Sequence, residues 1–371
     1  MKEAKAAPRL AFLEIRDKPA FCLTTRFSHK EQAMYYVGVD LHKKSISLCV
    51  VELVDRARKI VERRKFHCED EEQMAEYFAN LGEYQLVVEA TASYVWFVEL
   101  VEPTADRVVL AHPGHMRVIA QSKRKTDKFD AQTLAEFLAL DQIPEAWRPT
   151  PRVRQHRELV RHRNYVVRRS TSVKNKLRRV LSQYNADTKN LFSKAGRKYL
   201  AIIELSSVDR FVVDLLCEEF DQHRERLKRV DKQLKAFAKL APVAEQEARA
   251  VLESMPCVGP VTVEVVLAEA GDLRRFGSQR KATAYAGLAP GIRESAGKGK
   301  QLGITKQGSR LLRMILVETA WRLVNKTQRW GSLFEKLKVR CGAKKAIVAI
   351  ARRVWCVMVS MLRSGQKYKP T

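Results

Sequence analysis

The stretch from Tyr35 to Glu52, YYVGVDLHKKSISLCVVE, constrains the fold more than any other part of the chain. Its first apolar run ends on Asp40, and a second run follows in which apolar and small polar residues alternate. This pattern predicts two antiparallel strands joined by a tight connection. A carboxylate at the end of a buried strand is costly unless a partner neutralises it. Asp40 is therefore either ion-paired with a following lysine, Lys43 or Lys44, or a metal ligand that acts with other acids.

The residues after this stretch continue as a mixed α/β domain. No GxGxxG motif follows the first strand, which argues against a dinucleotide-binding fold. The order βββαβαβ implies a mixed sheet with helices on its faces, and it is the element order of the ribonuclease H-like fold. The expected strands are 35–40, 45–52, 60–67, 85–89 and 107–111, and the expected helices are 70–81, 94–102 and 114–121.

The remainder of the chain is predicted to be helical. An amphipathic helix is expected over 127–140, and prolines near 144–151 mark a boundary. Two long helices, 152–181 and 208–240, predict a helical hairpin or coiled coil. Beyond 250 we expect helices interrupted by a Gly/Lys-rich loop over 287–308, with the last helices at 310–325 and 343–362. The predicted domains are a poorly ordered extension (1–33), a catalytic domain (34–148), a basic coiled-coil region (149–248) and a C-terminal domain (249–371).

The charge of the chain points to a polyanionic partner. Lys and Arg number 69 against 42 acids, for a net charge of +27. Nucleic acid is the leading candidate for such a partner. The helix 152–181 holds eleven Lys or Arg residues and one acid, which repel one another unless phosphate lies against them. The alternative is a solvated charged bundle that only spaces two domains.

The seven cysteines are scattered and include no CxxC pair. We therefore expect reduced thiols and no zinc site. No run of apolar residues is long enough for a transmembrane helix, and the N-terminus lacks the apolar core of a signal peptide. Together these features predict a cytosolic protein.

Four acids are predicted to form a metal site. Asp40 and Glu89 each end a strand, and these strands should be neighbours; Asp127 and Asp130 share one face at the start of a helix. Four converging carboxylates repel one another unless a hard cation such as Mg²⁺, with Mn²⁺ as a substitute, lies between them. Two such ions can hold the attacking and leaving oxygens of a phosphodiester. The alternative is that the acids only balance nearby lysines: Lys123, Lys125 and Lys128.

Three motifs carry a specific resemblance. GVDLHKK, VVEATASY and KTDKFDA resemble the motifs of the DEDD-type insertion-sequence transposases, a group described as bridge-RNA-guided recombinases. The likeness continues through MPCVGPVTVEVVLAE and ATAYAGLAPGIRESAGKGKQLGITKQGSRLLR, and it spans about 35–365. It implies a RuvC-like N-terminal domain, a coiled-coil insertion and a C-terminal transposase domain with a nucleophilic serine. By the motif match, Asp40, Glu89, Asp127 and Asp130 bind the metal.

The same resemblance gives Ser295 the place of the nucleophile and implies a structured RNA partner, element-end and target DNA, and a homodimer or homotetramer. It also implies a location in the bacterial or archaeal cytosol, associated with the nucleoid. A serine that attacks a phosphodiester forms a covalent protein–DNA ester, so the strand can be resealed without ATP. The nearby Ser309 precedes a helix and is better explained as an N-cap.

Three other functions remain open. One is a RuvC-like nuclease that uses metal-activated water, for which Ser295 only contacts phosphate. Another is a nucleic-acid-binding protein with a decayed site. A sugar-kinase or actin-like ATPase shares the sheet topology, but the residues after Asp40 form no Gly-rich phosphate loop.

Overall fold

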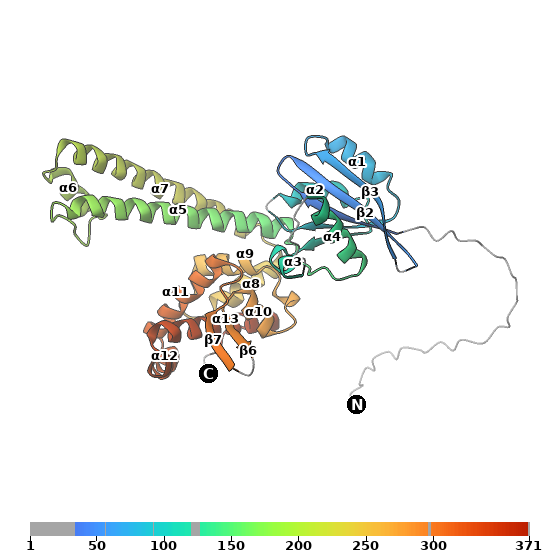
Figure 1. The fold of residues 1–371 in the computed structure, drawn as a ribbon. Helices are drawn as coiled ribbons and strands as arrows, with labels where there is room; N and C mark the ends of the chain where they lie inside the picture. The colour runs from blue at the N-terminus through green and yellow to red at the C-terminus, as the bar shows by residue number, and fades with distance from the viewer. Residues whose placement is uncertain (1–33, 56, 92, 120–126, 296–297, 370–371) are drawn as a thin grey trace, which may run out of the picture. The chain divides into compact units, whose positions relative to one another are not determined.

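The structure is a computed structural model that describes residues 34–55, 57–91, 93–119, 127–295 and 298–369. The predicted extension 1–33 lies outside the described residues. The chain divides into two compact units at Arg148 and Pro149. Each unit is described by itself below (Figure 1).

The first unit is built on a five-stranded mixed sheet with the order β3-β2-β1-β4-β5. β1, β2 and β3 pair antiparallel, whereas β1, β4 and β5 run parallel. The predicted order of strands and helices is confirmed. The strands are β1 (Tyr35–Leu41), β2 (Ser45–Val54), β3 (Ala57–His67), β4 (Tyr84–Glu89) and β5 (Arg107–Ala111). The helices are α1 (Glu71–Ala79), α2 (Tyr94–Val101), α3 (Pro113–Ile119) and α4 (Asp127–Ala139).

The two faces of this sheet are covered by different helices. Because side chains alternate along a strand, Val37 and Val39 of β1 face one side, where they pack with Met74 and Phe78 of α1. The opposite face is covered by α4, whose Ala131 and Ala135 pack against β2 and whose Leu134 and Leu138 pack against β4 and β5. Alternation therefore puts every second residue of β1 and β4 beneath α4.

Gly38 allows α4 to lie directly on β1. A Cβ atom at this position would be 2.0 Å from the Ala131 carbonyl oxygen and 2.3 Å from the Ala135 nitrogen. Both of these are backbone atoms, so no side-chain rotation could make room. The contact fixes the helix that begins at Asp127 over the strand that carries Asp40.

The second unit begins with a helical hairpin, as predicted, whose long helices lie side by side (Figure 1). The buried residues of α7 that face its partner helix recur three and four positions apart, as in a coiled coil: Val213, Leu216, Phe220 and His223. The free end of the hairpin has its own small apolar core of residues from all three helices, including Leu177, Leu200 and Phe220. The helices are α5 (Pro151–Ser182), α6 (Lys194–Ile202) and α7 (Ser207–Lys239).

The base of the hairpin is joined to the following helices by buried charges. His156 Nε2 lies 2.6 Å from an oxygen of Glu264, and Arg249 pairs with both Glu264 and Glu245. Arg152 also pairs with Glu245 and stacks over Phe237. Paired in this way, the charges are tolerated in a half-buried site. They hold the first turns of α5 against α8 (Val243–Glu253) and α9 (Pro260–Ala270).

The remaining helices bury a large apolar core around α13, where Trp355 and Met358 are fully buried. Two expectations were wrong here. The segment expected as a loop over 287–308 contains a two-stranded antiparallel hairpin, and a helix that was not predicted, α12, lies between the last two expected helices. The elements are η1 (Leu273–Arg275), α10 (Gln279–Tyr285), β6 (Pro290–Ser295), β7 (Lys298–Ile304), α11 (Arg310–Lys326), α12 (Gln328–Cys341) and α13 (Ala343–Ser364). No helix among the described residues is long and apolar enough to cross a membrane.

Candidate active site

The register of the sheet brings Asp40 and Glu89 together. The parallel pairing of β1 and β4 runs through Val39 opposite Val88, so the two acids follow as the next residues on neighbouring strands. Asp40 shares a face with Gly38, and Glu89 shares a face with Val87, which packs beneath α4. The prediction that their strands are neighbours is confirmed. Both acids are half-buried at the carboxyl edge of the parallel strands, on the face that α4 covers.

Asp40 has a close side-chain contact that the sequence did not suggest. The distance from Asp40 Oδ2 to His42 Nε2 is 3.0 Å. Among the described residues, His42 is thus a partner of Asp40. Because His42 is exposed, this contact lies at the solvent side of the strand end.

The other two predicted acids belong to α4. Asp127 is its first residue, and its side chain lies outside the described part of the structure. Asp130 is exposed and immediately precedes Ala131, which packs on Gly38. Within the described residues, no group of three or more His, Cys, Asp or Glu side chains is close enough to hold a metal ion. The convergence of all four acids therefore stays a prediction.

The row of residues that contains the two acids continues across the sheet. Asp40 pairs with Ser47, and Ser47 pairs with Lys65 on the edge strand β3. Residues opposite one another share a face, so Lys65 lies on the same side of the sheet as Asp40, about 10 Å away at two strand spacings. On the other side, Glu89 pairs with Ala111 at the end of β5.

Two histidines follow β5 directly and were missed in the sequence. The rings of His112 and His115 stack with centroids 4.3 Å apart, and the His115 amide donates to His112 Nδ1. The sequence signal for these histidines was the motif AHPGH directly after an apolar strand. Polar residues at the ends of β1 and β4 had been treated as candidate site residues for the same reason. His112 comes next after Ala111, beside the row that holds Glu89.

Ser295 is the last residue of β6, where it is paired with Lys298 of β7. Its side chain lies outside the described residues. Ser309 caps α11, since its hydroxyl accepts a hydrogen bond from the Leu312 amide at 3.1 Å. The N-cap prediction is confirmed.

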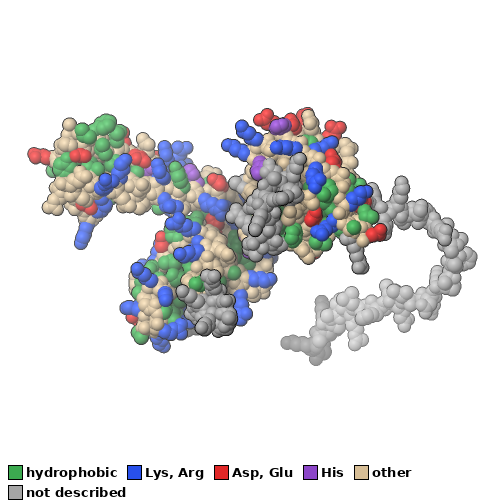
Figure 2. Space-filling view, viewed as in Figure 1, with side chains coloured by type: hydrophobic (Ala, Val, Ile, Leu, Met, Phe, Trp, Pro, Cys, Tyr) green, Lys and Arg blue, Asp and Glu red, His purple; other side chains and the backbone are tan. Residues whose placement is uncertain are grey.

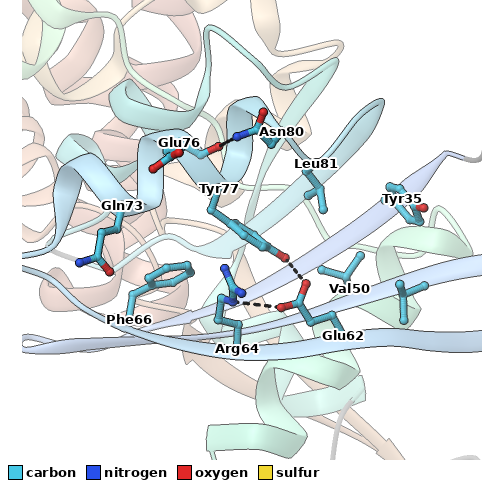
Figure 3. A pocket seen from close by; sticks show the side chains of 11 residues that line it. Tyr35, Val50, Glu62, Arg64, Phe66, Gln73, Glu76, Tyr77, Asn80 and Leu81 are labelled. Atoms are coloured by element: carbon cyan, nitrogen blue, oxygen red, sulfur yellow. Dashed lines mark hydrogen bonds and ion pairs between the residues drawn. The ribbon is translucent and has the colours of Figure 1, made fainter.

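A pocket of about 510 Å³ opens on the other face of the sheet, between β3 and α1 (Figure 3). Its polar groups satisfy one another: the Tyr77 hydroxyl donates to Glu62 at 3.0 Å, and Arg64 pairs with Glu62 and stacks over Tyr77. Burial, together with the hydrogen bond to Glu62, raises the pKa of Tyr77 well above its usual value. The acids Asp40 and Glu89 face away from this pocket, so the candidate chemistry lies elsewhere.

The basic helix is less free than its composition indicated. Several of its eleven cations are engaged within the protein: Arg152, Arg161, Arg163 and Arg178 pair with carboxylates, and Arg157 donates to backbone carbonyls of α9. The bidentate pair with Glu269 raises the pKa of Arg161 above its usual value and outweighs burial, which acts to lower it. Carboxylates therefore neutralise at least four of the eleven charges, so not every charge on this helix needs phosphate against it.

A cationic face nevertheless remains on α5. Residues spaced three or four apart recur on its outward side, so they lie along one stripe. Tyr165, which is 55% exposed, lies among them with the His162 ring stacked on it. The exposed cations of this α5 basic face are Arg168, Arg169, Lys176 and Arg179.

Comparison with known proteins agrees with this architecture. Residues 37–186 match the DEDD transposase domain of IS110 elements, and residues 249–335 match the transposase family of IS116, IS110 and IS902. The chain thus combines a DEDD-type catalytic domain with a second transposase domain. It is a DNA transposase, an enzyme, and both matched segments are similar to transposases of the IS110 family.

Several relatives match nearly the whole chain. The transposase of the element IS1111A from Coxiella burnetii is 26% identical over 90% of this chain and 91% of its own length. A probable family 20 transposase from Pseudomonas aeruginosa is 24% identical over 90% and 98%. The pilin gene-inverting protein of Moraxella bovis is 22% identical over 90% and 97%. These matches span both units of the structure.

Proposed function

We propose that this transposase cuts and rejoins DNA through a covalent phosphoserine intermediate, with a ribonuclease H-like, RuvC-like domain that supplies a metal site and a C-terminal domain that supplies the nucleophile Ser295. One observation carries the metal-site part of the proposal. Asp40 and Glu89 lie side by side at the carboxyl edge of parallel strands, beneath the helix that begins with Asp127. The strand order β3-β2-β1-β4-β5 supports the ribonuclease H-like assignment.

The donor set suits a hard divalent cation. Asp40 and Glu89 offer carboxylate oxygens, which Mg²⁺ prefers over nitrogen or sulfur ligands. DEDD-type transposases generally depend on divalent metal. Asp40, Glu89, Asp127 and Asp130 would hold Mg²⁺ or Mn²⁺, which supplies Lewis acidity toward a phosphate oxygen. Lys65, in the same row of the sheet, would contact the DNA backbone beside the acids.

The serine step exchanges one phosphoester bond for another, so the number of phosphoester bonds does not change. The Ser295 oxygen forms a bond to phosphorus as the bond to one deoxyribose oxygen breaks; the serine proton leaves to solvent or a nearby base, and the released strand end takes up a proton as a hydroxyl. A hydroxyl of another strand then reverses these steps. The gene-inverting relative from Moraxella bovis supports this chemistry, because inversion requires each cut strand to be rejoined.

Nucleic acid would bind along the α5 basic face. Its four cations lie on one stripe with an exposed tyrosine, and a tyrosine ring can stack on an unpaired base. A structured RNA encoded by the element, together with element-end and target DNA, would be the partners. We further propose that the enzyme works as a homodimer or homotetramer in the bacterial or archaeal cytoplasm, with the extension, catalytic, coiled-coil and transposase domains at the boundaries given above.

A trapping experiment tests the serine step. The protein is incubated with Mg²⁺, element-end DNA and RNA transcribed from the flanks of the element, and the products are separated on a denaturing gel. We expect a protein–DNA adduct that Ser295→Ala abolishes while nucleic-acid binding is kept. Ser309→Ala is the matched control, since that serine only caps a helix.

The same gel distinguishes a second candidate function. The acid pair alone would also serve a nuclease that uses metal-activated water. Cleavage that persists in the Ser295→Ala variant without an adduct would establish that nuclease and refute the covalent mechanism.

A further inference from the structure

The pocket between β3 and α1 is a preformed site with an apolar base and an aromatic wall (Figure 3). Buried Val50 and Phe66 line it, as does Val61, which is 47% exposed. The ring of Tyr77 lies 5.4 Å from that of Phe66, and the Arg64 guanidinium lies 4.6 Å from the Tyr77 ring, each measured to the ring centroid. The polar groups of this wall already satisfy one another. A ligand therefore meets ring faces and apolar side chains without displacing an internal hydrogen bond.

The same pocket lies at an open edge of the sheet. β3 is the outermost strand, and among the described residues it pairs only with β2. Its outer edge therefore presents backbone N–H and C=O groups that can pair with another extended segment. Glu62, Arg64 and Phe66 are two residues apart along β3 and all line the pocket, so they share one face of the strand. A strand added at this edge would set every second side chain beside these three residues.

The surroundings of the pocket are acidic, in contrast to the chain as a whole. Residues 69–83, which comprise α1 and its flanks, contain six acids and no lysine or arginine, whereas the chain has a net charge of +27. Figure 2 shows Asp and Glu side chains gathered at the top of the first unit, where α1 lies in Figure 1. Glu76 lines the pocket and is exposed, and within the described part of the chain its carboxylate has no ion pair. Such a surface repels phosphate and attracts a basic ligand.

We propose that this pocket binds a short basic segment of another protein, which pairs as an added strand with the outer edge of β3. An apolar side chain of the segment occupies the pocket over Val50 and Val61, and its lysine or arginine side chains lie against Glu76 and the other acids of 69–83. In strand addition, main-chain hydrogen bonds supply affinity and alternate side chains supply specificity. The site lies on the opposite face of the sheet from Asp40 and Glu89, and the inference does not depend on the proposed serine chemistry.

A labelled peptide tests the proposal. The probe is a short fluorescein-labelled peptide in which lysine and leucine alternate, and its fluorescence anisotropy is measured with the full-length, nuclease-treated protein. We expect saturable binding that a matched glutamate–leucine peptide lacks, because only the basic peptide complements the acids of 69–83. The basic peptide with methylated backbone amides should bind at least about tenfold more weakly, since it cannot donate main-chain hydrogen bonds. Hydrogen exchange in β3 should slow when the unmodified basic peptide is bound.

Two matched pairs of substitutions locate the site. Glu76→Lys and Val61→Asp should each weaken binding of the basic peptide at least about tenfold, because one reverses a charge at the pocket and the other places a charge on its apolar lining. Glu247→Lys and Val339→Asp make the same changes in the second unit and should bind the peptide as the wild type does. All four positions are exposed, so circular dichroism should match that of the wild type.

Three results would overturn the proposal. One is the absence of saturable binding of the basic peptide to the wild-type protein. Another is equal binding of that peptide by all four variants. The third is an affinity for nucleic acid that falls in Val61→Asp but not in Val339→Asp, because it would assign the pocket to nucleic acid rather than to a basic peptide.

Discussion

At the scale of single residues, Asp40 and Glu89 follow directly after the paired residues Val39 and Val88, at the ends of neighbouring parallel strands. Asp40 and Glu89 were predictable because each ends an apolar run, and a buried strand end is a costly place for a charge. Their common face and register depend on which strands pair, and pairing is a tertiary property that no local pattern encodes. The role of His42 was likewise hidden, because a histidine in a short connection carries no signal of its own.

Gly38 is the residue whose role became clear only in the structure, and it yields a direct prediction. The variant Gly38→Ala forces the backbone of α4 away from β1, since its Cβ would overlap two backbone atoms of that helix. We expect the free energy of unfolding to fall by about 3 kcal/mol, at the upper end for an overpacked site. Urea unfolding of the variant measures this change.

Gly303→Ala is the matched control, because a Cβ there meets nothing within 4 Å. Equal stability of Gly38→Ala and the wild type would contradict the close contact between α4 and β1. Strand cleavage should also fall in the Gly38 variant, because α4 carries Asp127 and Asp130.

At the scale of elements, regular periodicity was a good guide and irregular segments were not. The long helices α5 and α7 followed from sustained three-four spacing. The hairpin β6–β7 lacks alternation and is rich in Gly and Lys, so its pairing is invisible locally. The cations of α5 show the limit of composition, since it cannot tell a charge bound by a carboxylate of α9 from one that faces solvent.

The charge network at the base of the hairpin predicts a dependence on pH. Burial acts to raise the pKa of Glu245, but hydrogen bonds from Arg152 and Arg249 outweigh it and hold the pKa below its usual value. A depressed pKa in the folded state stabilises the fold above the ordinary glutamate range, and this stabilisation is lost as the pH falls through the folded pKa. Glu245→Gln should therefore be less stable than the wild type at pH 7, by about 1–3 kcal/mol for a partly buried group.

Thermal melts at pH 7 and pH 4 measure this difference. The loss of stability on acidification should be smaller in Glu245→Gln than in the wild type, because Gln does not titrate. Glu247→Gln, on the exposed side of the same helix, should behave as the wild type does. An acid-induced loss that is the same in all three proteins would refute the role of Glu245.

The α5 basic face predicts a specific salt dependence. Counterion release makes the logarithm of the binding constant fall linearly with the logarithm of salt concentration, with a slope set by the number of phosphates contacted. Replacing Arg169 and Lys176 by Gln should reduce that slope by about 2 and weaken binding to all sequences alike. Fluorescence anisotropy with labelled duplex across a salt series measures the slope. An unchanged slope would move the interface to another part of the chain.

At the scale of the whole molecule, binding and chemistry are assigned to different parts of the chain. The α5 basic face belongs to the second unit, whereas Asp40 and Glu89 belong to the first. Coulombic attraction to phosphate needs no metal, but a site built from carboxylates repels DNA until a cation neutralises it. Binding and cleavage should therefore respond differently when divalent ions are removed.

Chelation tests this separation. With EDTA in place of Mg²⁺, we expect strand cleavage to be lost while the affinity for nucleic acid at fixed ionic strength changes by less than about threefold, since the α5 basic face holds no metal ligands. Restoring Mg²⁺ should restore cleavage, and Asp40→Asn should fail to respond because Asn removes one of the two neighbouring carboxylates. Cleavage that persists in EDTA would exclude the acid pair from the reaction. Without a cation, the two negative carboxylates would repel the negative phosphodiester and could not act on it.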